Sequence, residues 1–307
     1  MLSRPLRIGT RGSPLALAQA NLVAGALRAV HGLDEAAVEI VAIRTTGDRI
    51  QDRPLADLGG KALWTKELDR ALAEGETDLS VHSMKDVESV RPDWLRLAGV
   101  LPRADVRDRL IGAASVDEIA ERGRVGTSSP RRAAQLRRLR PDLRIVPIRG
   151  NVATRLGKLR AGECDATLLA AAGLDRLGHG EVGVAVPVEM MLPAAAQGAI
   201  GVEVRAEDAM VGAMASAIGH SATTEAVETE RALLAALGGN CHAPAAVLAE
   251  VKDDRVRVRA QILSDDGTSC IEVDQLQDWH DREGAAALAA DMLDRAPEHV
   301  RRHFAGA

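Results

Sequence analysis

Two stretches of the chain share one pattern, in which a short apolar strand leads through a polar loop into an amphipathic helix. In the first, residues 6–10 precede Ser13, Pro14 and apolar positions 15, 18, 22 and 26, which is a helical spacing. In the second, residues 124–127 precede Ser129, Pro130 and a helix predicted over 131–139. Serine at the N-cap followed by proline predicts a helix start in both stretches.

A second repeated pattern follows each of these units. Residues 73–78 lead into a strand at 79–82, and residues 160–165 lead into a strand at 166–169. This order predicts a duplicated, doubly wound α/β design with two similar lobes on the plan of periplasmic binding proteins. We place lobe 1 at residues 1–100 with 199–218 and lobe 2 at 104–194. Proline and small residues at 100–104 and 193–198 suit hinges between the lobes.

After Gly219 the pattern changes to a small α+β domain, predicted over residues 219–307. A helix at 224–237 is followed by alternating strands around 247–251, 256–263 and 269–273. Asp265-Asp266-Gly267 predicts the hairpin turn of a three-stranded antiparallel sheet. Residues 284–304 are expected to supply a closing helix.

Charge is distributed unevenly along the chain. The 307 residues carry a net charge of −5, yet residues 122–160 hold twelve basic side chains against one acid, Asp142. An acidic protein with such a segment is expected to bind an anion there. Nucleic acid, a polycarboxylate or a phosphate would each fit, although one Phe, three Trp and no Tyr disfavour binding by base stacking.

The lengths of the apolar runs, the first residues and the cysteines indicate the cellular compartment. Apolar runs such as residues 166–173 are far shorter than the roughly 18–20 residues of a membrane helix, and the first residues resemble no signal peptide. Three scattered cysteines do not form a disulfide framework. We therefore expect a cytoplasmic protein that does not bind membranes.

Two loops and one strand end are candidates for chemistry. Residues 9–13 and 126–129 each lie at a helix N-terminus and would hold a carboxylate or phosphate, although neither is a nucleotide-binding motif. Lys85 and Asp86 come just after a predicted strand, where α/β sheets place reactive groups. A carboxylate among cations stays ionised and can stabilise positive charge that develops on a substrate.

Cys241 follows the end of a helix at Gly238 and Gly239, which predicts an exposed thiol that acts as a nucleophile or an attachment point. Cys164 lies at the start of a predicted buried strand and Cys270 on a predicted strand of the C-terminal sheet, and both are expected to be packing residues. No further metal ligand lies near Cys241, so we expect no metal. A cysteine–histidine protease site stays open on spacing alone, without positive support.

Eight blocks, in order through nearly the whole chain, resemble the porphobilinogen deaminase (hydroxymethylbilane synthase) family. They are residues 7–17, 60–68, 81–87, 125–132, 148–156, 172–178, 192–203 and 230–232, the last together with the loop that carries Cys241. The resemblance implies a three-domain monomeric transferase of porphyrin and heme biosynthesis. It joins four porphobilinogen molecules head to tail, with loss of ammonia, to give hydroxymethylbilane.

The resemblance also implies roles for individual residues. A dipyrromethane cofactor would be attached through a thioether to Cys241. Asp86, with Lys85, would assist deamination and stabilise the azafulvene cation. Cofactor, substrate and oligopyrrole intermediates would be held by Arg11, Ser13, Lys61, Lys85, Thr127, Ser128, Ser129, Arg131, Arg132, Arg149, Gly150, Arg155, Ala170 and Gln197.

Three positions depart from the family pattern. Glu88 replaces a common proline, Asn240 a glycine and Trp64 a frequent phenylalanine. The first could alter how the chain leaves Asp86, and the second how the Cys241 loop moves. Two alternatives remain: a two-lobed protein that binds anions reversibly without catalysis, and a nucleic-acid-binding protein that rests on the basic segment alone.

Overall fold

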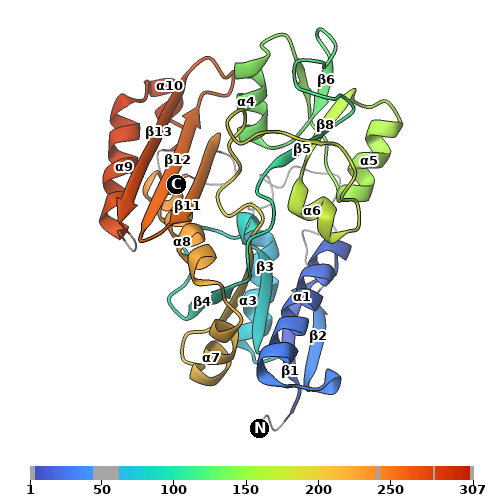
Figure 1. Ribbon diagram of the computed structural model, residues 1–307, viewed down its shortest axis with the longest axis vertical. Helices are drawn as coiled ribbons and strands as arrows, with labels where there is room; N and C mark the ends of the chain where they lie inside the picture. Colours follow the sequence, from blue (N-terminus) through green and yellow to red (C-terminus); the bar gives the residue numbers. More distant parts are fainter. Residues whose placement is uncertain (1–3, 44–61, 240–242, 279–280, 305–307) are drawn as a thin grey trace. The chain divides into compact units, whose positions relative to one another are not determined.

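The computed structural model describes residues 4–43, 62–239, 243–278 and 281–304 (Figure 1). The chain divides into two compact units. The first consists of Met1–Ala104 and Gly198–Thr224, and the second of Asp105–Gln197 and Glu225–Ala307. None of the described helices is long and apolar enough to span a bilayer.

The first unit is built on a five-stranded mixed sheet. Strand β1 runs parallel to β2 and β3, whereas β10 runs antiparallel to its neighbours β3 and β4. In spatial order the strands are β2 (Val38–Ile43), β1 (Leu6–Arg11), β3 (Leu79–Ser83), β10 (Ile200–Arg205) and β4 (Leu95–Val100).

Helices α1 (Pro14–His31) and α7 (Ala209–Ala217) bury their apolar stripes against the sheet. Val23 and Leu27 of α1 and Val211 of α7 belong to one core with the apolar side chains of β1, β3 and β10. Burying one side chain of this size stabilises the folded state by about 1.5–3 kcal/mol. The core therefore holds β1, β3 and β10 in place, together with the residues at the ends of these strands.

The other face of the same sheet is covered by α3 (Ala62–Ala73). Glu203 and Arg205 alternate along β10 with apolar core residues and therefore point away from α1. Arg205 donates to the carbonyl of Leu72 in α3 at 2.6 Å. This face is polar, and its charged side chains lie under α3.

The second unit contains a sheet of the same design. Strand β6 runs parallel to β7 and β8, and β5 is antiparallel to β8 and β9. In spatial order the strands are β7 (Arg144–Val146), β6 (Arg124–Gly126), β8 (Ala166–Ala170), β5 (Asp108–Ile111) and β9 (Val184–Ala185). The helices that follow them are α4 (Pro130–Leu139), α5 (Val152–Arg160) and α6 (Ala171–Arg176).

The two five-stranded sheets share strand order and strand directions, which confirms the prediction of duplicated α/β lobes. In each, the fourth strand in spatial order is the one antiparallel to the third, and it follows a predicted crossing segment. The helix starts are also as predicted. Ser13 accepts from the backbone N–H of Ala16 at 3.3 Å and Ser129 from that of Arg132 at 3.4 Å, each with proline at the next position.

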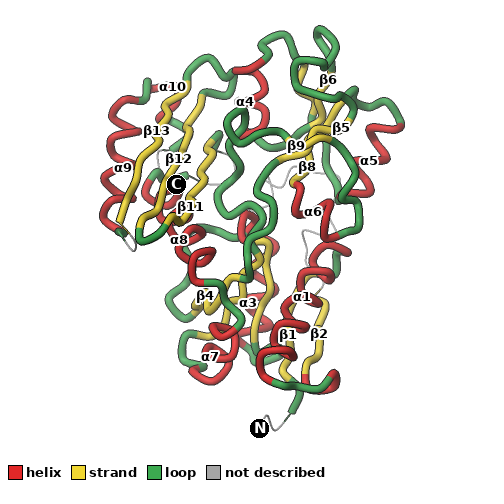
Figure 2. The backbone as a smooth tube through the Cα atoms, in the orientation of Figure 1, coloured by secondary structure: helices red, strands yellow, loops and turns green. Residues whose placement is uncertain are grey.

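The three-stranded antiparallel sheet is confirmed in the second unit (Figure 2). It consists of β11 (Ala245–Lys252), β12 (Arg255–Leu263) and β13 (Cys270–Asp278), and it packs with α8 (Ser221–Ala236) and α9 (Arg282–Arg295). Gly267 adopts a φ of 74° in the predicted hairpin turn. The expectation of one closing helix is wrong: α9 ends before Pro297, which lacks an N–H, and α10 (Glu298–Arg301) starts after it.

Candidate active site

The first lobe brings predicted residues to the ends of β1 and β3. Arg11 is the last residue of β1, and the Ser13 hydroxyl caps α1 by accepting from the N–H of Ala16. Lys85 and Asp86 lie in a 3₁₀ turn, η3 (Met84–Asp86), immediately after β3. Both side chains are half-buried. The carboxylate of Asp86 is therefore held on a short turn at the carboxyl end of a buried strand, as the sequence predicted.

The turn that carries Asp86 is tied to its neighbours on its N-terminal side. Gln19 of α1, which is 2% exposed, donates to the Ser83 hydroxyl at 2.6 Å. The N–H of Met84 donates to the carbonyl of Ala199 at 3.1 Å, ahead of β10. The turn is thus held by α1 and by the residue that precedes β10.

The second lobe presents a loop of hydroxyl side chains between β6 and α4. The Thr127 hydroxyl accepts from the N–H of Ser129 at 3.1 Å, and the Ser128 hydroxyl donates to the carbonyl of Ile148 at 2.9 Å. Ser129 caps α4. The loop is shaped by these bonds at a helix N-terminus, where N–H groups favour an anion.

Arg131 and Arg132 are buried and share one carboxylate, that of Asp108 in β5. Arg131 Nη2 lies 2.8 Å from Asp108 Oδ2, and Arg132 Nη2 lies 2.7 Å from Oδ1. Arg132 Nε and the amide of Gln197 donate to the same carboxylate at 3.1 and 2.9 Å. Ala170 pairs with Asp108 across the sheet. Four predicted site residues therefore meet at an aspartate that the sequence did not single out.

The electrostatics of this cluster favour an added anion. Burial opposes the charge on Asp108, but Arg131 and Arg132 hold its pKa far below its ordinary value. Burial lowers the pKa of Arg131, and Asp108 opposes that effect. Two guanidinium groups face one carboxylate here, and Arg131 Nε has no hydrogen-bond partner among the described residues. A buried, unpaired N–H of this kind is costly until an acceptor reaches it.

Arg149 and Gly150 lie on the loop that leads into α5, and Arg155 lies within α5 itself. Gly150 has a φ of 113°, which a side chain would strain, and Asn151 caps the helix by accepting from the N–H of Thr154 at 2.9 Å. Arg155 Nε donates to the carbonyl of Gly150 at 2.9 Å. The loop thus orders Arg155 beside the exposed Gly150.

The basic segment is not a single surface, because several of its arginines bind protein groups. Arg124 pairs with Asp165, and Arg140 with Asp142. Arg137 donates to the carbonyl of Asp265 at 2.7 Å, and Arg138 pairs with Glu272 at 3.2 Å. Part of the charge therefore holds lobe 2 and the C-terminal hairpin together, a use that composition alone did not indicate.

Lys61 and Cys241 lie outside the described residues, as does Asn240, and nothing is assigned to their positions. Cys164 is buried and Cys270 half-buried, in agreement with their predicted packing role. Burial raises the pKa of the Cys270 thiol to about 12, which disfavours the reactive thiolate.

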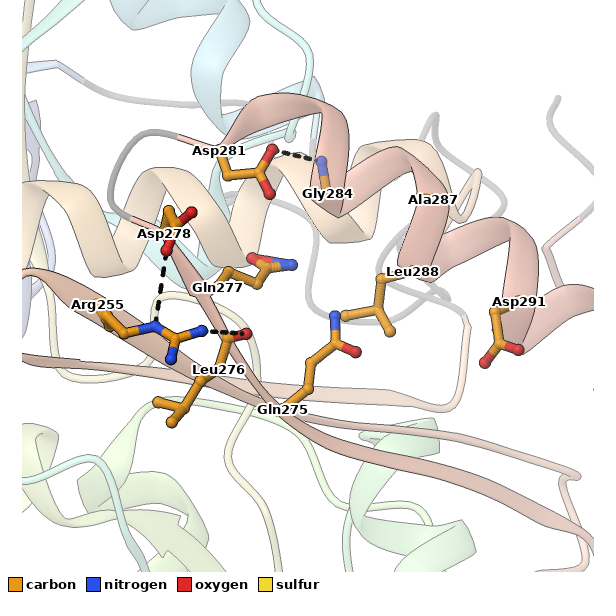
Figure 3. Close-up of a pocket in the computed structure, with 10 residues that line it drawn as sticks. All are labelled: Arg255, Gln275, Leu276, Gln277, Asp278, Asp281, Gly284, Ala287, Leu288 and Asp291. Atoms are coloured by element: carbon orange, nitrogen blue, oxygen red, sulfur yellow. Dashed lines mark hydrogen bonds and ion pairs between the residues drawn. The ribbon is translucent and has the colours of Figure 1, made fainter.

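A pocket of about 370 Å³ lies between β13 and α9 (Figure 3). Asp278, Asp281 and Asp291 line it; Asp278 pairs with Arg255 at 3.6 Å, and Asp281 caps α9. None of the predicted site residues that the structure describes lines this pocket, and three carboxylates are unsuited to a carboxylate-bearing ligand. No three His, Cys, Asp or Glu side chains come together as metal ligands within the described part of the chain.

Comparison with known proteins decides the family. Residues 6–213 match the family model "Porphobilinogen deaminase, dipyromethane cofactor binding domain", and residues 224–294 match "Porphobilinogen deaminase, C-terminal domain". The chain belongs to the porphobilinogen deaminase family. This confirms the resemblance, the enzyme class and the dipyrromethane cofactor inferred from the sequence.

Relatives match at nearly full length. The porphobilinogen deaminase of Sphingopyxis alaskensis is 56% identical and covers 98% of this chain and 97% of its own. That of Paracoccus denitrificans is 49% identical and covers 95% of each. A periplasmic VFT2 domain of Bordetella pertussis BvgS is 16% identical, with a TM-score of 0.38 over 75% of this chain and 90% of its own.

Proposed function

We propose that this chain condenses four porphobilinogen molecules head to tail, with release of ammonia, on a dipyrromethane cofactor attached to Cys241. The product is hydroxymethylbilane. The match of residues 6–213 and 224–294 to the family carries this proposal. We further propose that the protein acts in the cytoplasm as a monomer and binds neither nucleic acid nor membranes.

The cluster around Asp108 fits a ligand that carries carboxylates. Arg131 and Arg132 exceed the charge of Asp108 by one, and Arg131 Nε is buried without a hydrogen-bond partner in the described chain. We propose that these two arginines and the loop from Thr127 to Ser129 hold acetate and propionate groups. When bound, the cofactor supplies the pyrrole carbon to which the first substrate is joined.

Further cations would hold the chain as it grows. Each added pyrrole brings two carboxylates, so the product becomes a polyanion while it is bound. We propose that Arg11, Arg149 and Arg155 bind these groups. Because Arg155 is ordered by Gly150, its guanidinium loses little conformational freedom on binding.

Asp86 is proposed as the catalytic carboxylate. Its half-buried side chain on the turn after β3 would face the positive charge that develops on the substrate as ammonia leaves. Lys85, on the same turn, would hold a substrate carboxylate. In this proposal the Asp86 carboxylate meets the positive charge of the substrate, and the Lys85 ammonium meets one of its carboxylates.

The substitution Asp86→Asn tests this role because it removes charge with little change of shape. We expect turnover of porphobilinogen to fall on the order of 10²- to 10³-fold, with covalent cofactor retained in the intact-protein mass. Asp93→Asn is the control: it removes the charge of an exposed aspartate in the segment that follows the turn, and it should keep the wild-type rate. Near wild-type turnover by Asp86→Asn would show that this carboxylate is not catalytic.

The two alternative functions predict different measurements. A reversible anion-binding protein would show no covalent adduct in the mass of the denatured chain. A nucleic-acid-binding protein would retain DNA on a filter with a steep salt dependence. Arg124, Arg138 and Arg140 form ion pairs with carboxylates of the same chain, which leaves less of the basic segment for phosphates and favours the deaminase.

A further inference from the structure

A part-buried ion network lies on the C-terminal side of the turn that carries Asp86. Its centre is Arg91, five residues after Asp86, whose side chain is 11% exposed. Arg91 Nε and Nη2 donate to the two carboxylate oxygens of Glu203 at 3.0 and 2.9 Å. Nη2 also donates to Asp69 of α3 at 2.6 Å, and Nη1 to Glu88 at 3.3 Å.

This network connects three parts of the first lobe. Glu203 belongs to β10 and is 1% exposed, and Asp69 belongs to α3. Glu88, two residues after Asp86, also accepts from the Thr65 hydroxyl of α3 at 3.1 Å. The chain leaving the turn is therefore tied to a helix and a strand.

Opposite charges in this network stabilise one another, whereas its carboxylates repel: burial and the charge of Glu203 raise the pKa of Asp69, and Arg91 opposes that effect. Burial opposes the charge of Glu203, but His82 and Arg91 lower its pKa to about 2. Burial likewise opposes the charge of Arg91, but Glu203 and Asp69 raise its pKa. Charged groups removed from water and paired in this way have few alternative positions, since each displacement breaks a strong bond.

The N-terminal side of the turn is fixed by different contacts. Ser83 accepts from Gln19, and Met84 donates its N–H to Ala199. The side chain of Met84 lies so close over Gly201 of β10 that a Cβ at position 201 would collide with its sulfur. Both sides of the turn are thus anchored to the region of β10, and Arg91 provides the anchor after Asp86.

We propose that Arg91 is a positioning residue, which fixes the chain leaving the η3 turn and thereby orients the Asp86 carboxylate toward the substrate. Glu88, which departs from the family pattern, takes part in the same anchor. The inference rests on the proposed catalytic role of Asp86. It explains, in addition, what keeps the Asp86 carboxylate in one orientation.

The substitution Arg91→Gln in the cofactor-loaded enzyme tests the inference. We expect kcat for porphobilinogen consumption to fall about 10- to 100-fold, because small misplacements of a catalytic group cost rates of this size. KM should stay within about threefold, since substrate-binding cations are unchanged. Arg91→Lys keeps the positive charge and should restore part of kcat.

Arg205→Gln is the matched control. Arg205 lies on the same polar face, with a side chain 19% exposed, and binds the carbonyls of Leu72 and Thr77 and the carboxylate of Asp208. Its loss should lower the melting temperature of the first lobe while kcat stays at the wild-type value. If Arg91→Gln and Arg205→Gln lose stability equally and neither loses kcat, the inference is overturned.

Glu88→Gln keeps the test decisive if Arg91→Gln does not fold. Its side chain is 32% exposed, so its loss should leave the melting temperature nearly unchanged. We expect kcat to fall about threefold as the anchor loosens, and an unchanged kcat would overturn the inference. Asp86→Asn is measured in parallel: an active Asp86→Asn refutes the catalytic role itself, whereas an inactive one with a fully active Arg91→Gln refutes only the positioning role.

Discussion

Replacing Asp108 by asparagine should destabilise the second lobe far more than removing a charge from the surface of that lobe. The carboxylate receives hydrogen bonds from Arg131, Arg132 and Gln197, and its side chain is 1% exposed. Asparagine keeps the shape but leaves two buried guanidiniums without their balancing charge. Removing one partner of a buried ion pair costs about 3–5 kcal/mol. For a unit of this size the melting temperature should fall by about 6–20 °C.

Two further variants make the measurement specific. Arg131→Met leaves Arg132 and Asp108 as a balanced pair, so its free energy of unfolding should fall by less than that of Asp108→Asn. Asp165→Asn removes a 44%-exposed partner of Arg124 and should cost at most about 1 kcal/mol. Urea titrations followed by circular dichroism at pH 7 give all three values. A loss for Asp108→Asn no larger than that for Asp165→Asn would refute the reasoning.

Three other outcomes are expected. Cys241→Ser should give folded protein without covalent pyrrole or activity, whereas Cys270→Ala should keep both; peptide mapping that finds the adduct on Cys270 would contradict the assignment. Arg149→Leu or Arg155→Leu should melt cooperatively but accumulate covalent complexes with fewer than four added pyrroles, because a charge-assisted bond contributes roughly 1.5–3 kcal/mol. Mass spectra during turnover check this, and completion of the series at wild-type rate would contradict it. Glu203 has a folded pKa of about 2, below its ordinary 4.5, so its stabilisation of about 3 kcal/mol is present above pH 4.5 and is lost as pH falls toward 2. The difference in free energy of unfolding between wild type and Glu203→Gln should therefore shrink from pH 7 to pH 3, and a constant difference would contradict the assignment.

The elements of the fold could be predicted because their signals are local. Ser13 and Ser129 with the following prolines start helices wherever apolar positions recur at helical spacing. Gly267 marks a hairpin by its own backbone conformation. The site was predictable where it depends on such local features, as Lys85 and Asp86 do at the end of β3.

Partners brought together by tertiary structure could not be predicted. Arg131 and Arg132 are 23 and 24 residues from Asp108 along the chain, and only the antiparallel pairing of β5 with β8 places that aspartate beside them. The same holds for Glu203, which lies 112 residues from Arg91. The strand that Asp108 begins was not predicted from the sequence, and without that strand nothing showed that the carboxylate would be buried and would have to be paired.

The strand order of the first lobe also dictates when its sheet can be finished on the ribosome. β10 lies between β3 and β4, so residues 95–100 have no strand to pair with until residues 200–205 have been made. At roughly 5–20 residues per second, that interval lasts on the order of 5–20 s, during which β3 has an open edge. The sheet of the second lobe is already complete by residue 185. The lobe that is translated first therefore closes last, and its nascent form is the stage most exposed to aggregation and to chaperone binding.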